Sequence, residues 1–392
     1  MTNIDSWLLP DGIDDVLPEQ AQLVESARRK LLDLYANWGY DLVIPPMVEF
    51  TESLLSGSGS DLDLMTFRVT DQISGRMMGI RADITPQTAR MDAHSLSRQG
   101  PNRLCYAGTV LQTRPRGPLE SRTPISLGVE LFGEPSLKAD IEVIELFLKT
   151  LEVANVDSVH LDLGHVDIFR GLLADANLNP DQESLLFELL QRKAVAEIKD
   201  WVEENITDPT LKEWLNLLPT LSGDSSILQK AKIGLQGAPK TVIDALDQLE
   251  QVSSALSDKN ITIYLDLGEL PGFHYHTGIV FAAYVPGHGK ALGNGGRYDH
   301  VGESFGRSRP ATGFAFDLKS LVEKGRFESQ AKAGIYVSAD LYPDCQEIVA
   351  EYREQGQRVV QGFVGQEVNA QEINCDRQLV KQGKEYLIVK LA

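Results

Sequence analysis

The chain has 392 residues, enough for two or three domains that each bury their own hydrophobic core. Hydrophobic residues make up 42% and charged residues 24%, which is typical of a globular protein, and no apolar run approaches the length of a membrane span. The formal net charge of −19 disfavours a non-specific binder of nucleic acid or of anionic membranes, because each phosphate would meet a repulsive field.

The beginning of the chain and its cysteines indicate a cytoplasmic protein. The opening residues, MTNIDSWLLPDG, lack the basic residues and the apolar stretch of a signal peptide. Cys105, Cys345 and Cys375 lie far apart and form no CxxC-type spacing, so we expect them to be reduced and structural.

In chain order, the first strong pattern is a helix over residues 18–38. Pro18 suits its first turn and Gly39 suits its end. Apolar residues recur along it at intervals of three and four, as on a buried helix face: Leu23, Ala27, Leu31, Leu34, Tyr35 and Trp38. The segments that follow are a strand YDLVI ending at Pro45-Pro46, mixed short strands and loops over 57–110, a strand ISLGVELFG, a helix over 136–154 and a strand SVHLDLGHV.

The second half of the chain alternates between helical and strand-rich regions. Residues of about 168–258 read as a helical insertion, with helix patterns broken by Pro, Gly and Asp. Strands resume at ITIYLDLG, continue through GIVFAAYV and cross GNGGRYDH into TGFAFDLKSL. Beyond about residue 330, AGIYVSA, a helix near 343–355, RVVQGF and EYLIVKL predict a small α/β unit. We therefore expect a core domain over 1–325, which contains the insertion, and a C-terminal domain over 326–392.

The segment PGFHYHTG, residues 271–278, holds two histidines on either side of a tyrosine. On a strand, His274 and His276 would face one side and Tyr275 the other. A zinc site would need a third ligand and usually a fourth, and neither a cysteine nor a second histidine pair stands nearby. A pocket wall and an ordinary buried strand both stay open at this point.

Two further segments could carry chemistry. GNGGRYDHVGESFG would let a ligand approach the backbone, but it lacks the lysine of a phosphate-binding loop, and a glycine-rich turn between strands explains it more simply. RADITPQTAR places Arg81, Asp83 and Thr85 at strand spacing on one face, which a solvated sheet edge would also explain.

Taken together, seven collinear segments resemble the catalytic core of histidyl-tRNA synthetase, a class II aminoacyl-tRNA synthetase. They are LPDGIDDVLPEQ, PPMVEF, GIRADITPQTAR, LGVELFG, LDLGELPGFHYHTGIVF, GNGGRYDHVGESFG and ATGFAFDLKSL. The resemblance runs from about residue 9 to 322, with the insertion in the expected place. It implies an α+β fold: a class II synthetase-like antiparallel sheet flanked by helices, with a helical insertion and a small C-terminal α/β unit.

The resemblance also implies an amino-acid pocket. Asp83 stands where the family has a glutamate for the ammonium group, Thr85 matches, and Glu130 stands where it could accept from an imidazole N–H. Tyr275 matches the first signature tyrosine, and His276 takes the place of the second. The candidate histidine-binding residues are Asp83, Thr85, Gln112, Glu130, Tyr275 and His276. No catalytic residue, metal or cofactor is expected.

Departures from the family pattern fall on the positions that handle ATP. The second class motif should read Phe-Arg, and here it is Leu111-Gln112. The third should end in arginine, and here Ser320 follows Lys319; the histidine signature should open with arginine, and here it has Pro271. Charge develops at the α-phosphate during adenylation, so losing three guanidinium groups should abolish that reaction. The nearby residues that could compensate are Arg114, Arg116 and Arg122.

This combination resembles a synthetase paralogue family, the regulatory subunits of the short form of ATP phosphoribosyltransferase. The resemblance implies a non-catalytic partner that binds and activates the catalytic subunit in the first step of histidine biosynthesis and takes part in feedback inhibition by L-histidine. It further implies a homodimer core, from the helix–strand–proline stretch over 18–46, within a hetero-oligomer. No nucleic-acid partner is expected, because the terminal unit is short and acidic, and no membrane partner is expected, because the net charge is −19. The alternatives are a divergent, active histidyl-tRNA synthetase and a metal-dependent enzyme that uses HYH.

Overall fold

The computed structural model describes residues 8–56, 60–96, 98–115, 117, 120–257, 259, 261–268, 275–328, 333–365, 369–370 and 372–391. The chain divides into two compact units, Met1–Phe327 and Glu328–Ala392, and each is described by itself. No helix among the described residues is both long enough and apolar enough to cross a membrane.

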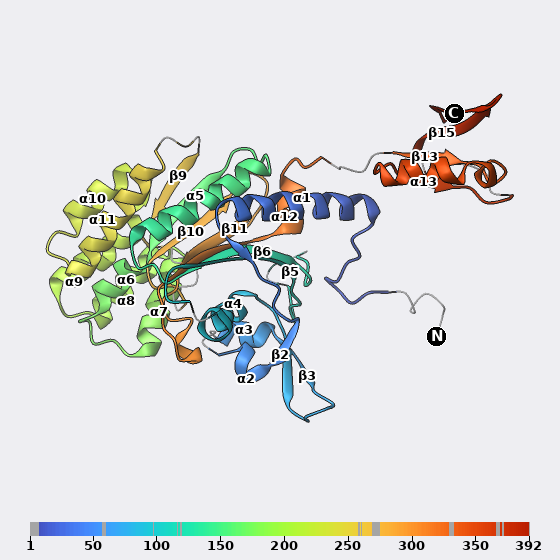
Figure 1. Ribbon diagram of the computed structural model, residues 1–392. Coiled ribbons are helices and arrows are strands. Elements are labelled where there is room, and N and C mark those ends of the chain that lie inside the picture. Colours follow the sequence, from blue (N-terminus) through green and yellow to red (C-terminus); the bar gives the residue numbers. More distant parts are fainter. Residues whose placement is uncertain are drawn as a thin grey trace. The chain divides into compact units, whose positions relative to one another are not determined.

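A nine-stranded sheet forms the centre of the first unit (Figure 1). Its strands run in the order β1 (Asp41–Leu42), β5 (Asn102–Thr109), β6 (Ile125–Phe132), β12 (Ala311–Asp317), β11 (Gly293–Arg297), β10 (Ile279–Tyr284), β7 (His160–His165), β9 (Thr262–Asp266) and β8 (Ser222–Gly223). From β5 to β7 every neighbouring pair is antiparallel, while β1 with β5 and β7 with β9 are parallel. The 3₁₀ turn η3 (Glu303–Phe305) lies between β11 and β12 in the chain.

Helices α1 (Pro18–Asn37), α5 (Leu137–Val153) and α12 (Leu318–Lys324) lie along one face of this sheet (Figure 1). The predicted apolar stripe of α1 is buried there in part, with Ala27, Leu31 and Tyr35 fully covered. Phe147 of α5 stacks on Phe316 of β12 with ring centres 4.6 Å apart. This aromatic and aliphatic layer is the main hydrophobic core of the unit.

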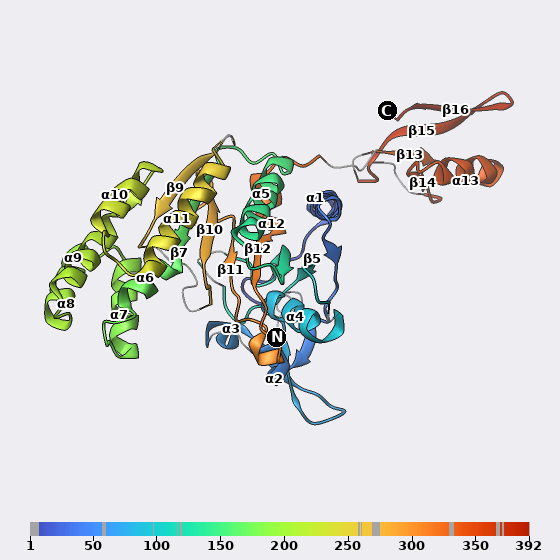
Figure 2. The same cartoon turned by 60° about the vertical axis from the view of Figure 1, so that its left-hand side comes forward.

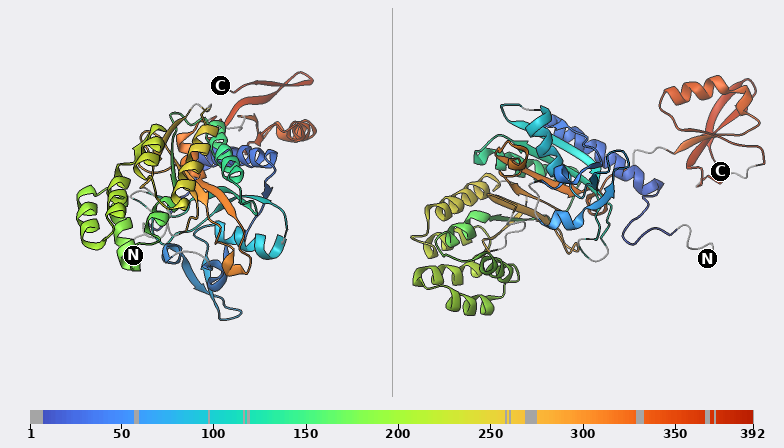
Figure 3. Two further views of the ribbon diagram at one scale, coloured as in Figure 1. Left: turned by 90° about the vertical axis from the view of Figure 1, so that its left-hand side faces the viewer. Right: turned by 90° about the horizontal axis from the view of Figure 1, so that it is seen from below.

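The N-terminal part also forms a small sheet with short helices. The sheet has the order β2 (Val48–Phe50), β4 (Met77–Ile80) and β3 (Phe67–Thr70), and the left view of Figure 3 shows its blue strands projecting from the unit. The helices are α2 (Thr51–Leu54), α3 (Ser60–Met65), α4 (Thr85–Arg90) and the π-helical turn η1 (Met91–Leu96). In Figure 1 they lie on the side of the large sheet opposite α1 and α5.

The predicted helical insertion forms six α-helices that gather at one end of the large sheet (Figure 2). They are α6 (Val166–Leu173), α7 (Pro180–Gln191), α8 (Val195–Asn205), α9 (Pro209–Leu217), α10 (Ser226–Gly234) and α11 (Lys240–Ala255), with the 3₁₀ turn η2 (Leu218–Thr220) after α9. Proline in the first turn and a side-chain cap start two of them: Asn179 before α7 and Asp208 before α9.

The C-terminal unit is a four-stranded sheet with one α-helix. The strand order is β14 (Val359–Gln361), β13 (Gly334–Val337), β15 (Cys375–Gln382) and β16 (Glu385–Lys390), and the 3₁₀ turn η4 (Tyr342–Asp344) precedes helix α13 (Gln346–Glu354). A small core of Ile335, Val337, Val349 and Leu379 joins the helix to the sheet. Strand β15 was not predicted, because its sequence CDRQLVKQ carries charged and amide side chains in place of a clear apolar alternation.

Candidate functional site

Strand alternation places Glu130 on the face of the sheet opposite the α1 and α5 layer. Leu127, Val129 and Leu131 of β6 point into the main core, so Glu130 between them points the other way. It lies opposite Leu104 of β5 and Gly313 of β12 in the ladder. A carboxylate in the centre of a sheet, flanked by core residues, is a strong indication of a functional group.

Glu130 is 1% exposed and is held by two hydroxyl groups. Thr85 Oγ1 donates to Glu130 Oε1 at 2.8 Å, and the Tyr106 hydroxyl donates to the same oxygen at 3.1 Å. Burial raises the pKa of Glu130 well above its ordinary value, and nearby Asp83 raises it further, while the two hydrogen bonds partly oppose this. A ligand N–H group that donates to this carboxyl group would therefore stabilise its charged form.

Asp83 and Thr85 reach the site through a turn and a helix start. The predicted strand spacing of RADIT is wrong, because Ile84 has helical backbone angles and α4 begins at Thr85. Asp83 Oδ1 accepts from the backbone N–H groups of Ile84 at 2.6 Å and Thr85 at 3.3 Å, which satisfies donors that a helix start leaves unpaired. Arg81 takes a structural role, since it is buried and donates to the carbonyls of Thr109 and Pro45.

Tyr275 and His276 form an aromatic wall together with Tyr298. The predicted strand through HYH is wrong for its described part, because β10 begins only at Ile279. The rings of Tyr275 and His276 therefore meet edge to face with centres 5.3 Å apart and do not point to opposite sides. Tyr275 also stacks on Tyr298 at 5.1 Å. His274 lies outside the described residues.

The hydrogen bonding of His276 defines what its ring can do. The ring is 7% exposed, and Nδ1 lies 3.2 Å from the carbonyl oxygen of Arg297. A carbonyl only accepts, so Nδ1 carries the proton and Nε2 is a hydrogen-bond acceptor. The pKa of His276 is lowered to about 4, mainly by burial and to a smaller extent by the positive charge of Arg170, while the hydrogen bond to the Arg297 carbonyl opposes this. His276 is thus a neutral acceptor at neutral pH.

Gln112 lies buried beside the backbone that leads to Asp83. Its Nε2 donates to the carbonyl of Ala82 at 3.4 Å. The backbone N–H of Gln112 donates to the Arg122 carbonyl at 2.8 Å, and Arg122 Nε donates to the Gln112 carbonyl at 2.9 Å. Gln112 therefore borders the Asp83 end of the site, while Glu130 and the aromatic wall form the other end.

Glycines make the close approaches in this site possible. The GNGG segment is strand β11, not the glycine-rich turn that its composition suggested. A side chain on Gly296 would meet Ile279 O at 2.5 Å and His276 Nδ1 at 2.9 Å. A side chain on Gly313 would meet Glu130 Oε2 at 2.1 Å and the Tyr298 hydroxyl at 2.4 Å. The site exists because neither position carries a Cβ atom.

Sequence reasoning missed Tyr106 and Tyr298. Tyr106 lies on the same sheet face as Glu130, two strand positions after Leu104, but its strand NRLCYAGT gave no alternation clear enough to assign that face. Tyr298 follows β11 directly. The glycines before it suggested that a ligand could approach the backbone, so the tyrosine was not predicted as a site residue.

Near the positions where the sequence departs from the synthetase pattern, Ser320, Lys319 and Arg122 all have hydrogen-bond partners within the protein. Ser320 Oγ donates to Asp317 Oδ2 at 2.7 Å, and Lys319 Nζ donates to Thr123 Oγ1 at 3.4 Å. Arg122 donates to two backbone carbonyls and lies over the ring of Phe67. Pro271 and Arg116 lie outside the described residues, and Arg114 is exposed.

Within the described ranges, no group of three or more His, Cys, Asp or Glu side chains is arranged to hold a metal ion. The three cysteines are buried and free. Burial raises the pKa of the Cys105 thiol to about 12, which keeps it protonated.

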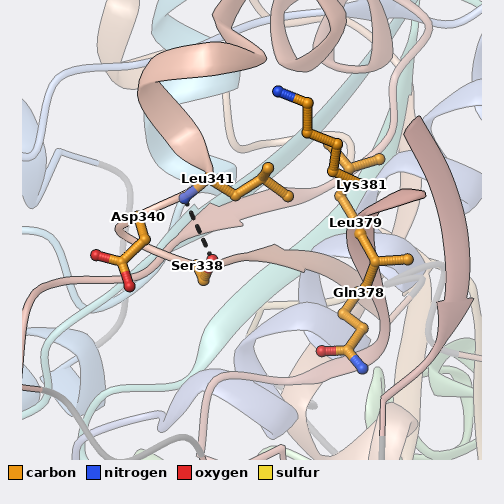
Figure 4. Close-up of a pocket in the computed structure, with 7 residues that line it drawn as sticks. Ser338, Asp340, Leu341, Gln378, Leu379 and Lys381 are labelled. Atoms are coloured by element: carbon orange, nitrogen blue, oxygen red, sulfur yellow. Dashed lines mark hydrogen bonds between the residues drawn. The ribbon is translucent and has the colours of Figure 1, made fainter. Parts of the chain in front are cut away.

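A separate, shallow depression of about 330 Å³ lies in the C-terminal unit (Figure 4). It is lined by Ser338, Asp340, Leu341, Gln378, Leu379, Val380 and Lys381. The N–H of Leu341 donates to Ser338 Oγ at 3.4 Å, and Lys381 pairs with Asp344 at 3.0 Å. It shares no residue with the group of side chains around Glu130, here called the Glu130 cluster. The cluster consists of Asp83, Thr85, Tyr106, Glu130, Tyr275, His276 and Tyr298.

Comparison with known proteins decides the family. A model of histidyl-tRNA synthetase matches residues 12–321, and a model of the C-terminal domain of the ATP phosphoribosyltransferase subunit HisZ matches residues 332–389. The chain is 53% identical over 394 residues to the ATP phosphoribosyltransferase regulatory subunit of Saccharophagus degradans, with 100% of both chains covered. It is 51% identical to the subunit of that name from Thioalkalivibrio sulfidiphilus, with 98% of both covered. The chain belongs to the ATP phosphoribosyltransferase regulatory subunit family.

Solved structures confirm the class II synthetase-like fold predicted for this family member. An ATP phosphoribosyltransferase regulatory subunit/histidyl-tRNA synthetase from Bacillus halodurans has a TM-score of 0.83 at 26% identity, covering 96% of this chain and 99% of that one. The histidyl-tRNA synthetase from Nostoc sp. PCC 7120 has a TM-score of 0.78 at 17% identity, covering 98% and 97%. At that lower identity the likeness concerns the fold alone.

Burial of Glu130 predicts a pH-dependent cost to the stability of this regulatory-subunit family member. Its pKa is raised above the ordinary 4.5, so above about pH 4.5 the folded chain keeps a proton that the unfolded chain releases. Stability should fall as pH rises from there to the raised folded pKa, by up to about 1.4 kcal/mol per pH unit. Glu130→Gln keeps the shape and has no such proton, so it should be more stable, by a margin that grows with pH.

Urea unfolding of both proteins without histidine, at several pH values, measures this margin. Exposed Glu213 offers a control, since Glu213→Gln changes a carboxyl group at the surface and should leave the pH profile unchanged. Equal stability of Glu130→Gln and the unsubstituted protein at every pH would contradict the expectation.

Proposed function

We propose that this protein is the non-catalytic regulatory subunit of a short-form ATP phosphoribosyltransferase. It binds and activates the catalytic subunit in the first step of histidine biosynthesis and takes part in feedback inhibition by L-histidine. Support comes from relatives of that name at about 50% identity along the whole chain, and from the match of residues 332–389 to the HisZ C-terminal domain. The buried Glu130 cluster is the observation that carries the effector part of the proposal.

The cluster has the chemistry that a histidine zwitterion needs. Asp83 offers a carboxylate to the α-ammonium group, and Glu130 accepts from the imidazole N–H. The two carboxylates influence each other, as the effect of Asp83 on the pKa of Glu130 reflects, so a ligand that brings positive charge and an N–H donor relieves their repulsion. The pocket residues are Asp83, Thr85, Gln112, Glu130, Tyr275 and His276.

Regulation follows if histidine binds one conformation of the complex better than another. The inhibition can be no stronger than this difference in affinity, which is typically about 1–3 kcal/mol. The protein need not carry out any chemistry for this, and the residues at the ATP-handling positions fit a subunit without adenylation activity.

We also propose a homodimer core and a domain boundary near residue 325. After α1, the side chains of Leu42, Ile44 and Met47 are exposed and apolar, with Ile44 85% exposed, in the stretch that the resemblance assigns to the dimer contact. Several exposed apolar side chains within one short segment are typical of an interaction surface. Residues 326–392 form the second domain.

The direct test is to assay a short-form catalytic subunit with and without this chain, and then with histidine. Turnover should rise several-fold when the chain is added, and histidine should reduce it toward the value of the catalytic subunit alone. Analytical ultracentrifugation of the mixture should show a hetero-oligomer. Turnover that does not respond to the chain, although the two proteins associate, would rule out the activating role.

A further inference from the structure

The three-stranded sheet of β2, β3 and β4 has one entirely apolar face. Residues that lie directly opposite each other in an antiparallel ladder point to the same side of the sheet, and every second residue along a strand joins them. Every position of the three strands on this side is apolar, and we call it the small-sheet face. Its six residues are Val48, Phe50, Phe67, Val69, Met78 and Ile80.

The fold covers the other side of this sheet and leaves the small-sheet face open. Gly79 points to the other side, where an added side chain would meet Leu54 of α2 at 2.8 Å. On the small-sheet face, all six side chains keep some exposure, none belongs to a hydrophobic core of the described residues, and Val69 is 40% exposed. A sheet whose apolar side lacks a covering layer is typical of a protein contact.

The β3–β4 hairpin adds further exposed apolar side chains at an ordered tip. The hairpin projects from the unit in the left view of Figure 3, with Ile73 97% and Met77 43% exposed. Asp71 orders the turn: its carboxylate accepts from the N–H groups of Ile73 at 3.1 Å and Ser74 at 3.2 Å, and its own N–H donates to the Arg76 carbonyl at 2.8 Å. A backbone that is ordered before binding loses little conformational entropy on binding.

Two guanidinium groups lie over the aromatic rings of this face. Arg76 lies 3.6 Å from the ring centre of Phe50, and Arg122 lies 5.3 Å from that of Phe67. Aromatic residues, methionine and arginine without lysine or acidic residues are the composition of the centre of a protein–protein contact. A guanidinium has five N–H donors, so it can bind a carboxylate of a partner in addition to groups of its own chain. The face therefore suits a surface that combines apolar side chains with Asp or Glu.

A partner of different sequence fits this face better than a second copy of the chain. In a two-fold contact the same patch meets itself, so Arg76 and Arg122 would face like charges. A contact between this face and another patch of a second copy would continue into rings or open filaments.

The small sheet is also joined directly to the proposed histidine site. Strand β4 ends at Ile80, three residues before Asp83. Thr66, directly before β3, forms a bridge with Gln112, and the N–H of Arg81 donates to the carbonyl of the residue before β2 at 3.0 Å. A protein bound to this sheet would touch the elements that carry Asp83 and Gln112, which suits the partner whose activity responds to histidine.

We propose that the small-sheet face and the tip of the β3–β4 hairpin form the surface on which this chain binds the catalytic subunit. The catalytic subunit would meet it with apolar side chains bordered by carboxylates. This inference rests on the proposed function and names the surface through which the two proteins associate.

Sedimentation of mixtures with a short-form catalytic subunit, over a range of concentrations, tests this surface. Ile73→Asp and Val69→Asp should each weaken association about 10- to 100-fold, as expected for residues at the centre of a contact, and activation of the catalytic subunit should fall in parallel. Ile233→Asp makes the same change at a 68% exposed isoleucine on α10 and should leave association unchanged. Association of the unsubstituted protein should weaken as salt is added, because arginine–carboxylate attraction is screened.

The outcomes are distinguishable. Unchanged association in both hairpin variants, an equal loss in Ile233→Asp, or association that does not respond to salt would overturn this surface and leave the proposed function standing. Loss of self-association by Ile73→Asp, in sedimentation of the chain alone, would assign the face to a second copy and overturn the inference. No association of the unsubstituted protein would overturn the proposed function as well. Thermal unfolding and histidine binding should match the unsubstituted protein in every variant, since these side chains lie at the surface.

Discussion

Replacing Glu130 by alanine should weaken histidine binding by about 10- to 100-fold and should relieve feedback inhibition to the same degree. A hydrogen bond to a charged group is worth about 1.5–3 kcal/mol, and Glu130 is the only described carboxylate held by both Thr85 and Tyr106. The substitution also removes the acceptor of those two hydroxyls, which would then reorganise the pocket around the ligand. We therefore expect this to be the most damaging single change in the site.

Assembly and activation should survive the same substitution. Glu130 is 1% exposed on the inner face of the sheet, so a partner protein cannot touch it. The measurement is histidine titration by calorimetry, followed by turnover of the complex over a range of histidine concentrations. Glu303→Ala, at an exposed position, serves as the control and should behave as the unsubstituted protein. Full feedback inhibition in Glu130→Ala would mean that the effector binds elsewhere.

The large elements could be predicted because their apolar periodicity is regular. The helix over 18–38 is observed as α1 (Pro18–Asn37), and that over 136–154 as α5 (Leu137–Val153). Strand ISLGVELFG is observed as β6 (Ile125–Phe132), and its alternation alone places Glu130 away from the core. Where periodicity was weak, as in β15, the prediction missed the element.

The site itself could be predicted less well, because it depends on close approaches between distant segments. Glycine composition suggested a turn over GNGG, whereas β11 is a strand whose glycines allow neighbours to come near, as His276 does at Gly296. Spacing suggested a strand at RADIT, whereas the pairing of Asp83 with the start of α4 sets the local backbone. Tertiary packing determines the backbone conformation of both segments, and local sequence patterns do not contain that information.

Glycine placement also explains why one sheet face can hold a polar site. The α1 and α5 side is filled by large side chains such as Phe147 and Phe316. On the other side, Gly128 and Gly313 lie next to the Tyr106 hydroxyl and Glu130, where any Cβ would collide with them. The same strands thus build a dense core on one face and leave room for polar groups on the other.

The purified chain should give no detectable ATP–pyrophosphate exchange with histidine. Losing one donor that stabilises developing charge typically costs about 100- to 1,000-fold in rate. The resemblance to the synthetases implies that Gln112, Ser320 and Pro271 stand at three positions where the family has arginine. Gln112 and Ser320 are neutral and are hydrogen-bonded to Ala82 and Asp317, so neither supplies a positive charge to a phosphate. The combined loss should take the reaction below detection.

An active histidyl-tRNA synthetase assayed in parallel provides the positive control for exchange. Arg122 is the nearby guanidinium that could contradict the expectation, although it is engaged with the carbonyls of Gln112 and Asp11. If exchange were observed, Arg122→Gln would test whether that side chain had left its backbone partners to bind the phosphates. Histidine-dependent exchange well above background would favour the divergent synthetase, since a subunit that only senses histidine has no use for a bound and reactive ATP.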